Sequence, residues 1–188
     1  RARLAGAGGR GDRPSFTRRP LRAPSLGGNG GVYGPGYELL EGTPRERGTE
    51  EYRDSGKYQL RRWNMASEGN LAEFVARVNR IRRENPALHG DWSLVFCPVD
   101  NDQLVAYAKK SGDNVIVCIV NLDPDHVQSG WLELDLAAPG VEGTAYQMHD
   151  MLSDQHFFRE GPRNFVLLDP GKLPAHVMRL VPRPRSEL

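Results

Sequence analysis

Apolar residues in the middle of the chain recur at the spacing of an α-helix. They are separated by three or four positions: Leu71, Phe74, Val75, Val78 and Ile81. Charged residues fall on the opposite side: Glu73, Arg77, Arg80 and Arg83. Ser67 or Asn70 can cap the start, and Asn85-Pro86 ends the pattern because proline disfavours a helical conformation in the residue before it. The pattern therefore predicts one amphipathic helix over residues 71–85.

From Leu88 onward, short apolar runs are separated by Gly, Pro, Asp and Asn. The runs 94–96 and 104–109 flank Asp100-Asn101-Asp102, which indicates a turn and an antiparallel hairpin. The β-branched run Val115–Val120 predicts a central strand that is buried on both faces. Further strands are expected at 131–136, 144–149, 157–158, 165–168 and 175–181. Seven or eight short strands without intervening helices favour an antiparallel β-sandwich.

The segment before the helix has a different character. Val32–Leu40 is predicted to be a short strand or extended piece, broken by a Gly34-Pro35-Gly36 turn, and a polar loop follows it. Residues 1–31 contain seven Arg, eight Gly and three Pro and show no periodicity. Such a composition is typical of a disordered tail, with a basic arm for nucleic acid or an acidic surface as the alternative.

Composition and charge narrow the class of protein. The 188 residues suffice for one domain and a tail or for two small domains, and a chain with 38% hydrophobic and 26% charged residues is neither a membrane protein nor fully disordered. The sequence contains no transmembrane run and no secretory signal, so we expect a soluble, non-exported chain. Residues 1–31 carry a net charge of +6, which leaves −5 on the rest and gives the body no nucleic-acid footprint.

Candidate chemistry is sparse. Cys97 and Cys118 lie in apolar surroundings and lack partners at metal-ligand spacing, so we expect two buried thiols, a reducing compartment and no metal or other cofactor. Asp100-Asn101-Asp102 lacks the remaining ligands of a calcium loop and is interpreted as a plain turn. His149 and His176 fall on predicted strands, where structural histidines are the commoner kind. Neighbouring apolar residues favour core packing over a glucan-stacking platform for two tryptophans, Trp92 and Trp131.

One polar loop brings a cation next to aromatic rings. Lys57-Tyr58 precedes Arg61-Arg62-Trp63. A lysine can neutralise a phosphate, and a tyrosine offers a sugar a flat apolar face and a hydroxyl group. The residues by themselves favour an ordinary exposed loop over such a site.

Several segments in order resemble one enzyme family. They are Tyr33-Gly34-Pro35-Gly36-Tyr37-Glu38-Leu39, the run 51–58, the run 78–88, Asp100-Asn101-Asp102-Gln103-Leu104, the run 120–124 and Gln128-Ser129-Gly130-Trp131. The family is the bacterial α-1,4-glucan:maltose-1-phosphate maltosyltransferase, a member of the α-amylase clan, and the resemblance covers residues 31–181.

The resemblance implies a mainly β chain with three parts. Residues 1–30 would be the disordered tail, residues 31–87 the last strand, substrate loop and last helix of a (β/α)8 barrel, and residues 88–188 an antiparallel β-sandwich C-terminal domain. Residues 31–40 would hold the eighth barrel strand and its loop. The catalytic carboxylates of the family would fall before residue 1, so no catalytic residue is assigned and the chain by itself is expected to be inactive.

The resemblance also implies a substrate contact and partners. The Lys-Tyr pair that the family uses for maltose 1-phosphate corresponds to Lys57 and Tyr58, although Gly56 replaces the usual acidic residue before it. The intact enzyme would transfer maltosyl units from maltose 1-phosphate to α-1,4-glucans with retention, in the cytoplasm and as a homodimer. The Arg/Gly-rich start departs from the family's apolar helix, and a frameshifted or truncated upstream segment would explain it. The alternative is a stand-alone carbohydrate-binding or scaffolding module, which would have no use for the helix at 71–81.

Overall fold

The computed structural model describes residue 27 and residues 34–40, 62–137 and 145–182. The predicted disordered tail over residues 1–30 falls outside these residues except for Gly27, and Lys57 and Tyr58 also lie outside them. Eight strands are present in the described part: β1 (Val95–Cys97), β2 (Leu104–Ser111), β3 (Asn114–Asn121), β4 (Gln128–Glu133), β5 (Tyr146–Asp150), β6 (Gln155–Arg159), β7 (Arg163–Leu168) and β8 (Ala175–Pro182). The predicted mainly β architecture is confirmed.

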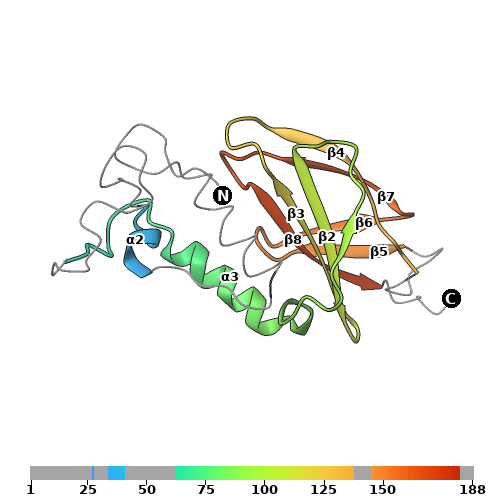
Figure 1. The fold of residues 1–188 in the computed structure, drawn as a ribbon, viewed down its shortest axis with the longest axis horizontal. Coiled ribbons are helices and arrows are strands. Elements are labelled where there is room, and N and C mark those ends of the chain that lie inside the picture. The colour runs from blue at the N-terminus through green and yellow to red at the C-terminus, as the bar shows by residue number, and fades with distance from the viewer. Residues whose placement is uncertain (1–26, 28–33, 41–61, 138–144, 183–188) are drawn as a thin grey trace.

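The strands form two antiparallel sheets that face each other (Figure 1). The larger sheet has six strands in the order β1-β2-β3-β8-β5-β6, and the smaller sheet pairs β4 with β7. The hairpin predicted around Asp100-Asn101-Asp102 is confirmed, because β1 pairs antiparallel with β2. The predicted central strand is also confirmed, since β3 lies between β2 and β8 and is buried along almost its whole length.

Side chains of β3 alternate between two hydrophobic cores. Val115, Val117 and Ile119 face the inner core between the two sheets. Ile116 and Cys118 belong to a second core on the other side of the large sheet. Alternation with a period of two explains why an uninterrupted apolar run suits a strand that is covered on both faces.

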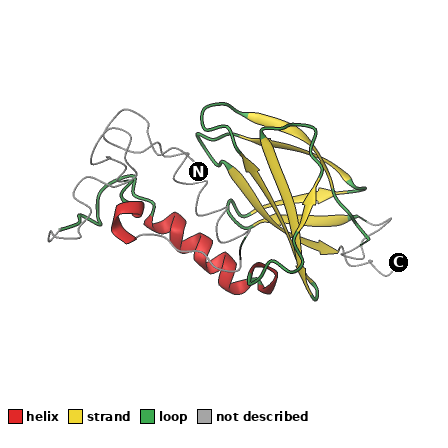
Figure 2. Cartoon of the chain, in the orientation of Figure 1, coloured by secondary structure: helices red, strands yellow, loops and turns green. Residues whose placement is uncertain are grey.

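The second core lies between the large sheet and two helical segments, α3 (Ala72–Glu84) and the short 3-10 helix η1 (Pro86–Leu88). Figures 1 and 2 show α3 running alongside the large sheet. The helix predicted over 71–85 is confirmed, and its buried side chains include Val78 and Ile81. The N-cap position is Leu71, so neither Ser67 nor Asn70 occupies it, although Asn70 Oδ1 accepts a hydrogen bond from the backbone N–H of Ala72 at 3.0 Å. No helix in the described residues is long and apolar enough to cross a membrane.

The extended piece predicted before the helix is wrong where the structure describes it. Gly34–Glu38 forms a helix, α2, where the sequence predicted an extended piece broken by a Gly34-Pro35-Gly36 turn. Pro35 in the first turn has the fixed φ that a helix requires. Tyr37 and Leu40 pack against Leu71 at the start of α3, so a contact more than thirty residues away stabilises the turn of helix.

Three smaller expectations also need correction. Strand β4 begins at Gln128 and ends at Glu133, earlier than the predicted 131–136. Core packing was the wrong prediction for Trp92 and Trp131, which are 73% and 42% exposed. Cys118 is buried as expected, but Cys97 is only partly buried.

Candidate functional site

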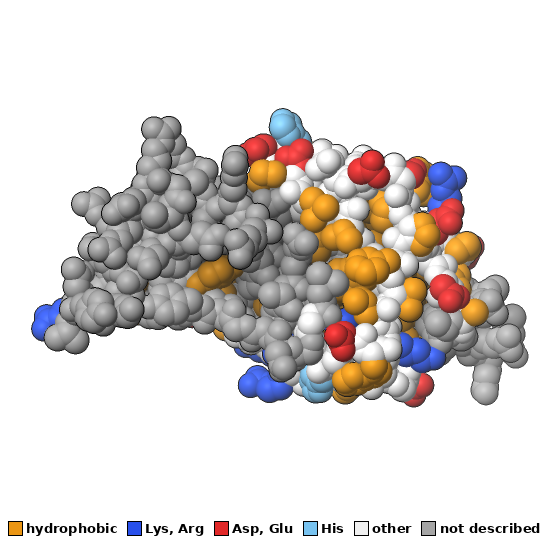
Figure 3. Space-filling view, viewed as in Figure 1, with side chains coloured by type: hydrophobic (Ala, Val, Ile, Leu, Met, Phe, Trp, Pro, Cys, Tyr) orange, Lys and Arg blue, Asp and Glu red, His pale blue; other side chains and the backbone are white. Residues whose placement is uncertain are grey.

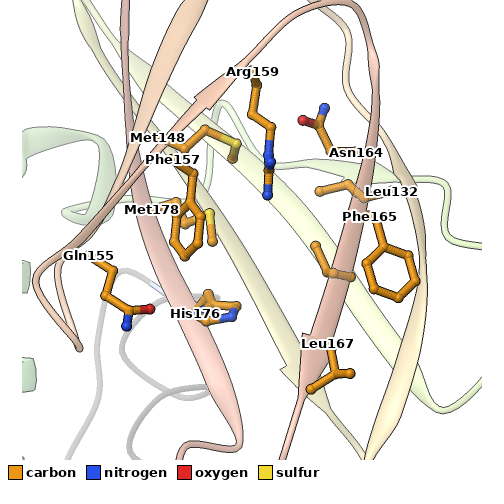
Figure 4. Close-up of a pocket in the computed structure, with 11 residues that line it drawn as sticks. Leu132, Met148, Gln155, Phe157, Arg159, Asn164, Phe165, Leu167, His176 and Met178 are labelled. Atoms are coloured by element: carbon orange, nitrogen blue, oxygen red, sulfur yellow. The ribbon is translucent and has the colours of Figure 1, made fainter.

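A cleft opens between the two sheets where β6 and β7 approach each other. Its volume is about 300 Å³. One wall comes from β5, β6 and β8 and the other from β4 and β7, with Arg159 extending into the space between them (Figure 4). The side chains that line the cleft include Gln155, Phe157, Arg159, Asn164, Phe165 and His176. This size is at the lower end of the range for small-molecule sites.

His176 is held in place by a buried carboxylate behind the wall of the cleft. Asp150 is fully buried and accepts four hydrogen bonds: from the backbone N–H groups of Leu152 and Val177, the Ser153 hydroxyl and His176 Nδ1. Burial alone would raise the pKa of Asp150, but the hydrogen bond and charge of His176 and the other donors outweigh it, and the net pKa is lowered. The ionised carboxylate therefore holds a proton on His176 Nδ1 and fixes the orientation of the ring.

The opposite wall carries a buried amide with an unsatisfied acceptor. Asn164 Nδ2 donates to the Tyr146 hydroxyl at 2.8 Å and to the Pro162 carbonyl at 3.1 Å. The Tyr146 hydroxyl in turn donates to the carbonyl of Gly161 at 2.8 Å, and burial raises the pKa of Tyr146. Asn164 Oδ1 has no hydrogen-bond partner among the described residues. A buried acceptor without a donor favours a ligand or water that supplies one.

The remaining contacts in the cleft are aromatic. Arg159 lies over the Phe157 ring at 5.3 Å, and the Phe157 and His176 rings meet edge to face at 6.3 Å. None of the described lining residues is Asp or Glu. Retaining glycosyl transfer needs two carboxyl groups about 5 to 5.5 Å apart, so this lining is suited to binding and not to that chemistry.

The outer face of the small sheet presents a second aromatic group. Trp131 and Phe165 are cross-strand neighbours with ring centroids 5.4 Å apart, and Arg163 lies over the Trp131 ring at 4.8 Å. Both aromatic rings are partly exposed, and Leu167 beside them is 54% exposed. Figure 3 shows hydrophobic side chains gathered over the strands on the face it displays. The rings form a flat apolar surface of the kind on which sugars stack.

Comparisons with known proteins show what this chain is similar to. Residues 96–180 match the family described as "GLGE, C-terminal". A maltosyltransferase of Streptomyces coelicolor, alpha-1,4-glucan:maltose-1-phosphate maltosyltransferase 2, is 44% identical over 90% of this chain and 26% of its own length. The Salinibacter ruber protein of the same name is 39% identical over 94% of this chain and 26% of its own length. The chain is a relative of these maltosyltransferases.

The chain spans about a quarter of the length of these relatives. A solved structure supports the fold. The noncanonic maltogenic α-amylase of Thermotoga neapolitana superposes with a TM-score of 0.66 at 14% identity, covering 91% of this chain and 37% of that protein. The β-sandwich is thus an architecture that α-amylase-type enzymes carry.

Two sequence motifs that resemble this family meet at one end of the sandwich. Asn101 Nδ2 donates to Gln128 Oε1 at 3.0 Å and to the Ser129 carbonyl at 2.9 Å. Asn101 Oδ1 accepts from the backbone N–H of Gln103 at 2.8 Å, which confirms the predicted turn. Gln128 Nε2 also reaches Asp123 Oδ2 at 3.0 Å. These polar residues therefore hold the loops together.

Sequence reasoning did not find the cleft. His176 and His149 were interpreted as structural histidines, and both do contact carboxylates, at 2.9 Å from Asp150 and 2.7 Å from Asp154. Asn164 is the residue that could have pointed to the cleft. It occupies a buried position of β7, on the same face as Val166. A polar residue at such a position indicates either a buried hydrogen bond or a site.

Proposed function

We propose that this chain is the C-terminal portion of an enzyme that transfers maltosyl units from maltose 1-phosphate to the non-reducing end of α-1,4-glucans, with retention. The observation that carries the proposal is the 44% identity to a named maltosyltransferase over 90% of the chain. Residues 31–87 would be the end of the catalytic barrel and residues 88–188 the C-terminal domain. The helix α3, which packs its apolar side against the large sheet, supports this division.

The substrate contact in this proposal is the loop that contains Lys57 and Tyr58. The Lys57 ammonium group would neutralise the donor phosphate, and the Tyr58 ring and hydroxyl would contact the sugar. The nucleophile and the acid/base would be supplied by barrel strands outside this chain. The described sandwich would then act as a support for the barrel.

Location and assembly belong to the same proposal. We infer a cytoplasmic enzyme, because Cys97 and Cys118 face different cores on opposite sides of the large sheet and are therefore not joined by a disulfide. Burial, with the Asp135 carboxylate nearby, raises the pKa of the Cys97 thiol to about 11, which keeps it protonated and unreactive. A homodimer is the assembly that the resemblance implies.

The experiment compares the chain alone with a chimera. Residues 31–188 are grafted onto the complete catalytic part of a homologous maltosyltransferase, and release of phosphate from maltose 1-phosphate is measured. We expect turnover by the chimera and none by the purified 188-residue chain above a mock-purified control. Turnover by the chain alone would overturn the assignment of the catalytic groups, and a folded but inactive chimera would overturn the proposed function.

A second candidate function is favoured by the exposed pair of Trp131 and Phe165. A stand-alone carbohydrate-binding module would use such a surface to hold a glucan chain. Titration of the chain with maltoheptaose, followed by tryptophan fluorescence, separates the two candidates. Binding that disappears in Trp131→Ala and persists in Trp92→Ala, an exposed tryptophan elsewhere on the chain, would favour the binding module.

A further inference from the structure

The hairpin of β5 and β6 places two histidines directly opposite each other. His149 pairs with His156 in the strand register. Their rings stack with centroids 4.2 Å apart and planes 7° from parallel. Both are thus held by a paired backbone, and their ring nitrogens face the same side of the sheet.

The turn between the two strands adds a carboxylate to this pair. Asp154 adopts a left-handed backbone conformation with φ of 64°, and its N–H donates to the Asp150 carbonyl at 2.7 Å. Its side chain folds back, so that Oδ1 lies 2.7 Å from His149 Nε2. Three side chains with metal-binding atoms therefore converge at the end of one hairpin.

We propose that His149, Asp154 and His156 bind a divalent first-row transition metal ion such as Zn²⁺. One ligand atom from each residue lies within 4.8 Å of the other two. Tetrahedral zinc with bonds of about 2.0 to 2.2 Å holds its ligands roughly 3.4 Å apart, so closing the site needs only a side-chain rotation. Two imidazoles and one carboxylate suit zinc, cobalt, nickel or copper better than calcium or magnesium, which prefer oxygen ligands only.

The neighbouring contacts fit this role. His156 Nδ1 contacts the side-chain amide of Gln147, which orients the ring and leaves Nε2 for the metal. Between His149 Nε2 and Asp154 Oδ1, the ion would replace the proton that now joins them. A water molecule would complete the coordination, since the structure describes three ligands here and the Asp154 side chain is 74% exposed.

The site is reached from a groove of about 690 Å³ between α3 and the large sheet, which His149 helps to line. Three arginines line the same groove, Arg77, Arg80 and Arg179, together with two glutamates, Glu73 and Glu84. Arg77 is tied to the Met151 carbonyl at 2.8 Å, and its positive charge acts on Asp154. These cations oppose a bound metal ion, so affinity rests on the three ligands and should be sensitive to the loss of any one.

The test is zinc binding by the full 188-residue chain without a histidine tag. Competition with a chromophoric chelator gives stoichiometry and affinity, and we expect one ion per chain. His156→Ala and Asp154→Asn should each weaken binding by at least about tenfold, and Gln147→Ala by less. His126→Ala is the matched control, because His126 Nδ1 lies 3.0 Å from Asp123 Oδ2 and no third ligand joins this pair in the part of the chain that the structure describes.

A spectroscopic measurement tests the same ligands directly. Substoichiometric Zn²⁺ should shift the imidazole nitrogen signals of His149 and His156 and leave those of His126 in place. The proposal is overturned if the wild-type chain does not bind zinc. It is equally overturned if both ligand variants, shown by circular dichroism to be folded, bind within twofold of wild type. Loss of affinity in the His126→Ala control instead would assign the ion to a different site.

Discussion

Asp100 Oδ1 accepts a hydrogen bond from the backbone N–H of Trp131 at 2.6 Å, across thirty-one positions of the chain. The contact joins the turn after β1 to the middle of β4 and so connects the large sheet to the small one. Gly130 precedes Trp131 in β4 and lies against the turn that contains Asp100. A Cβ atom at Gly130 would be 2.9 Å from Asp100 Oδ1, 3.2 Å from Val99 and 3.3 Å from Asn101.

We expect Gly130→Ala to destabilise the chain by about 1 to 3 kcal/mol, because the added methyl group must push the 99–101 turn away from β4. Urea denaturation followed by circular dichroism measures the free energy of unfolding. Gly112→Asn is the control: its Cβ would meet nothing within 4 Å, and asparagine tolerates the φ of +56° there. A loss in Gly112→Asn as large as that in Gly130→Ala would refute the crowding argument.

The buried carboxylate of Asp150 should make stability depend on pH. Its pKa is lowered in the folded chain, so the unfolded chain binds its proton more readily. The stabilisation is therefore complete above the unfolded value of about 3.9 and is lost as the pH falls through the folded value. We expect the free energy of unfolding to decrease on acidification below about pH 4.

Asp150→Asn should lower the free energy of unfolding by about 3 kcal/mol at pH 7 and should reduce its decrease at acidic pH. The amide keeps the shape of the carboxylate but cannot accept from all four donors that surround it. Urea midpoints at pH 3, 4, 5 and 7 for the wild type and the variant give the comparison. Parallel curves for the two proteins would show that other groups cause the acid dependence.

The aromatic pair on the small sheet should stabilise it even though both rings are partly exposed. Trp131 and Phe165 meet edge to face, a geometry worth about 0.5 to 1.5 kcal/mol beyond burial. A double-mutant cycle with Trp131→Ala and Phe165→Ala measures this coupling in urea denaturation. Strictly additive losses would show that each ring packs independently, with Arg163 as the remaining partner of Trp131.

Local patterns predicted most of the sandwich because each strand obeys its own rule. All residues of Val115–Val120 except Cys118 are β-branched, and this strand is buried between two neighbouring strands, so propensity and burial agree. The sequence was misleading at Gly34–Glu38, where glycines suggested a turn but contact with Leu71 favours a helix. It was also misleading at Trp131, since neighbouring apolar residues do not reveal on which face of a two-stranded sheet a side chain lies.

Local sequence patterns could not predict the candidate sites, because each site joins residues from different strands. Asp150 and His176 are twenty-six positions apart and meet because β5 pairs with β8. The cleft joins β6 to β7, strands of different sheets, and no periodicity predicts how sheets face each other. The pairing of His149 with His156 depends on the register of one hairpin, and a shift of one residue would separate the two side chains.

The active chimera also allows the proposed phosphate contact of Lys57 to be tested. If the donor phosphate lies against this loop, Lys57→Ala removes a charge-assisted contact of about 1.5 to 3 kcal/mol. The kcat/KM for maltose 1-phosphate should then fall roughly tenfold to a hundredfold, while the unfolding of the sandwich is unchanged. Lys57→Arg should restore only part of the loss, because a planar guanidinium does not fit a site shaped for a compact ammonium group. An active chimera in which Lys57→Ala leaves kcat/KM within twofold of wild type would assign the loop a structural role, because a phosphate contact of this strength cannot be lost without slowing donor use.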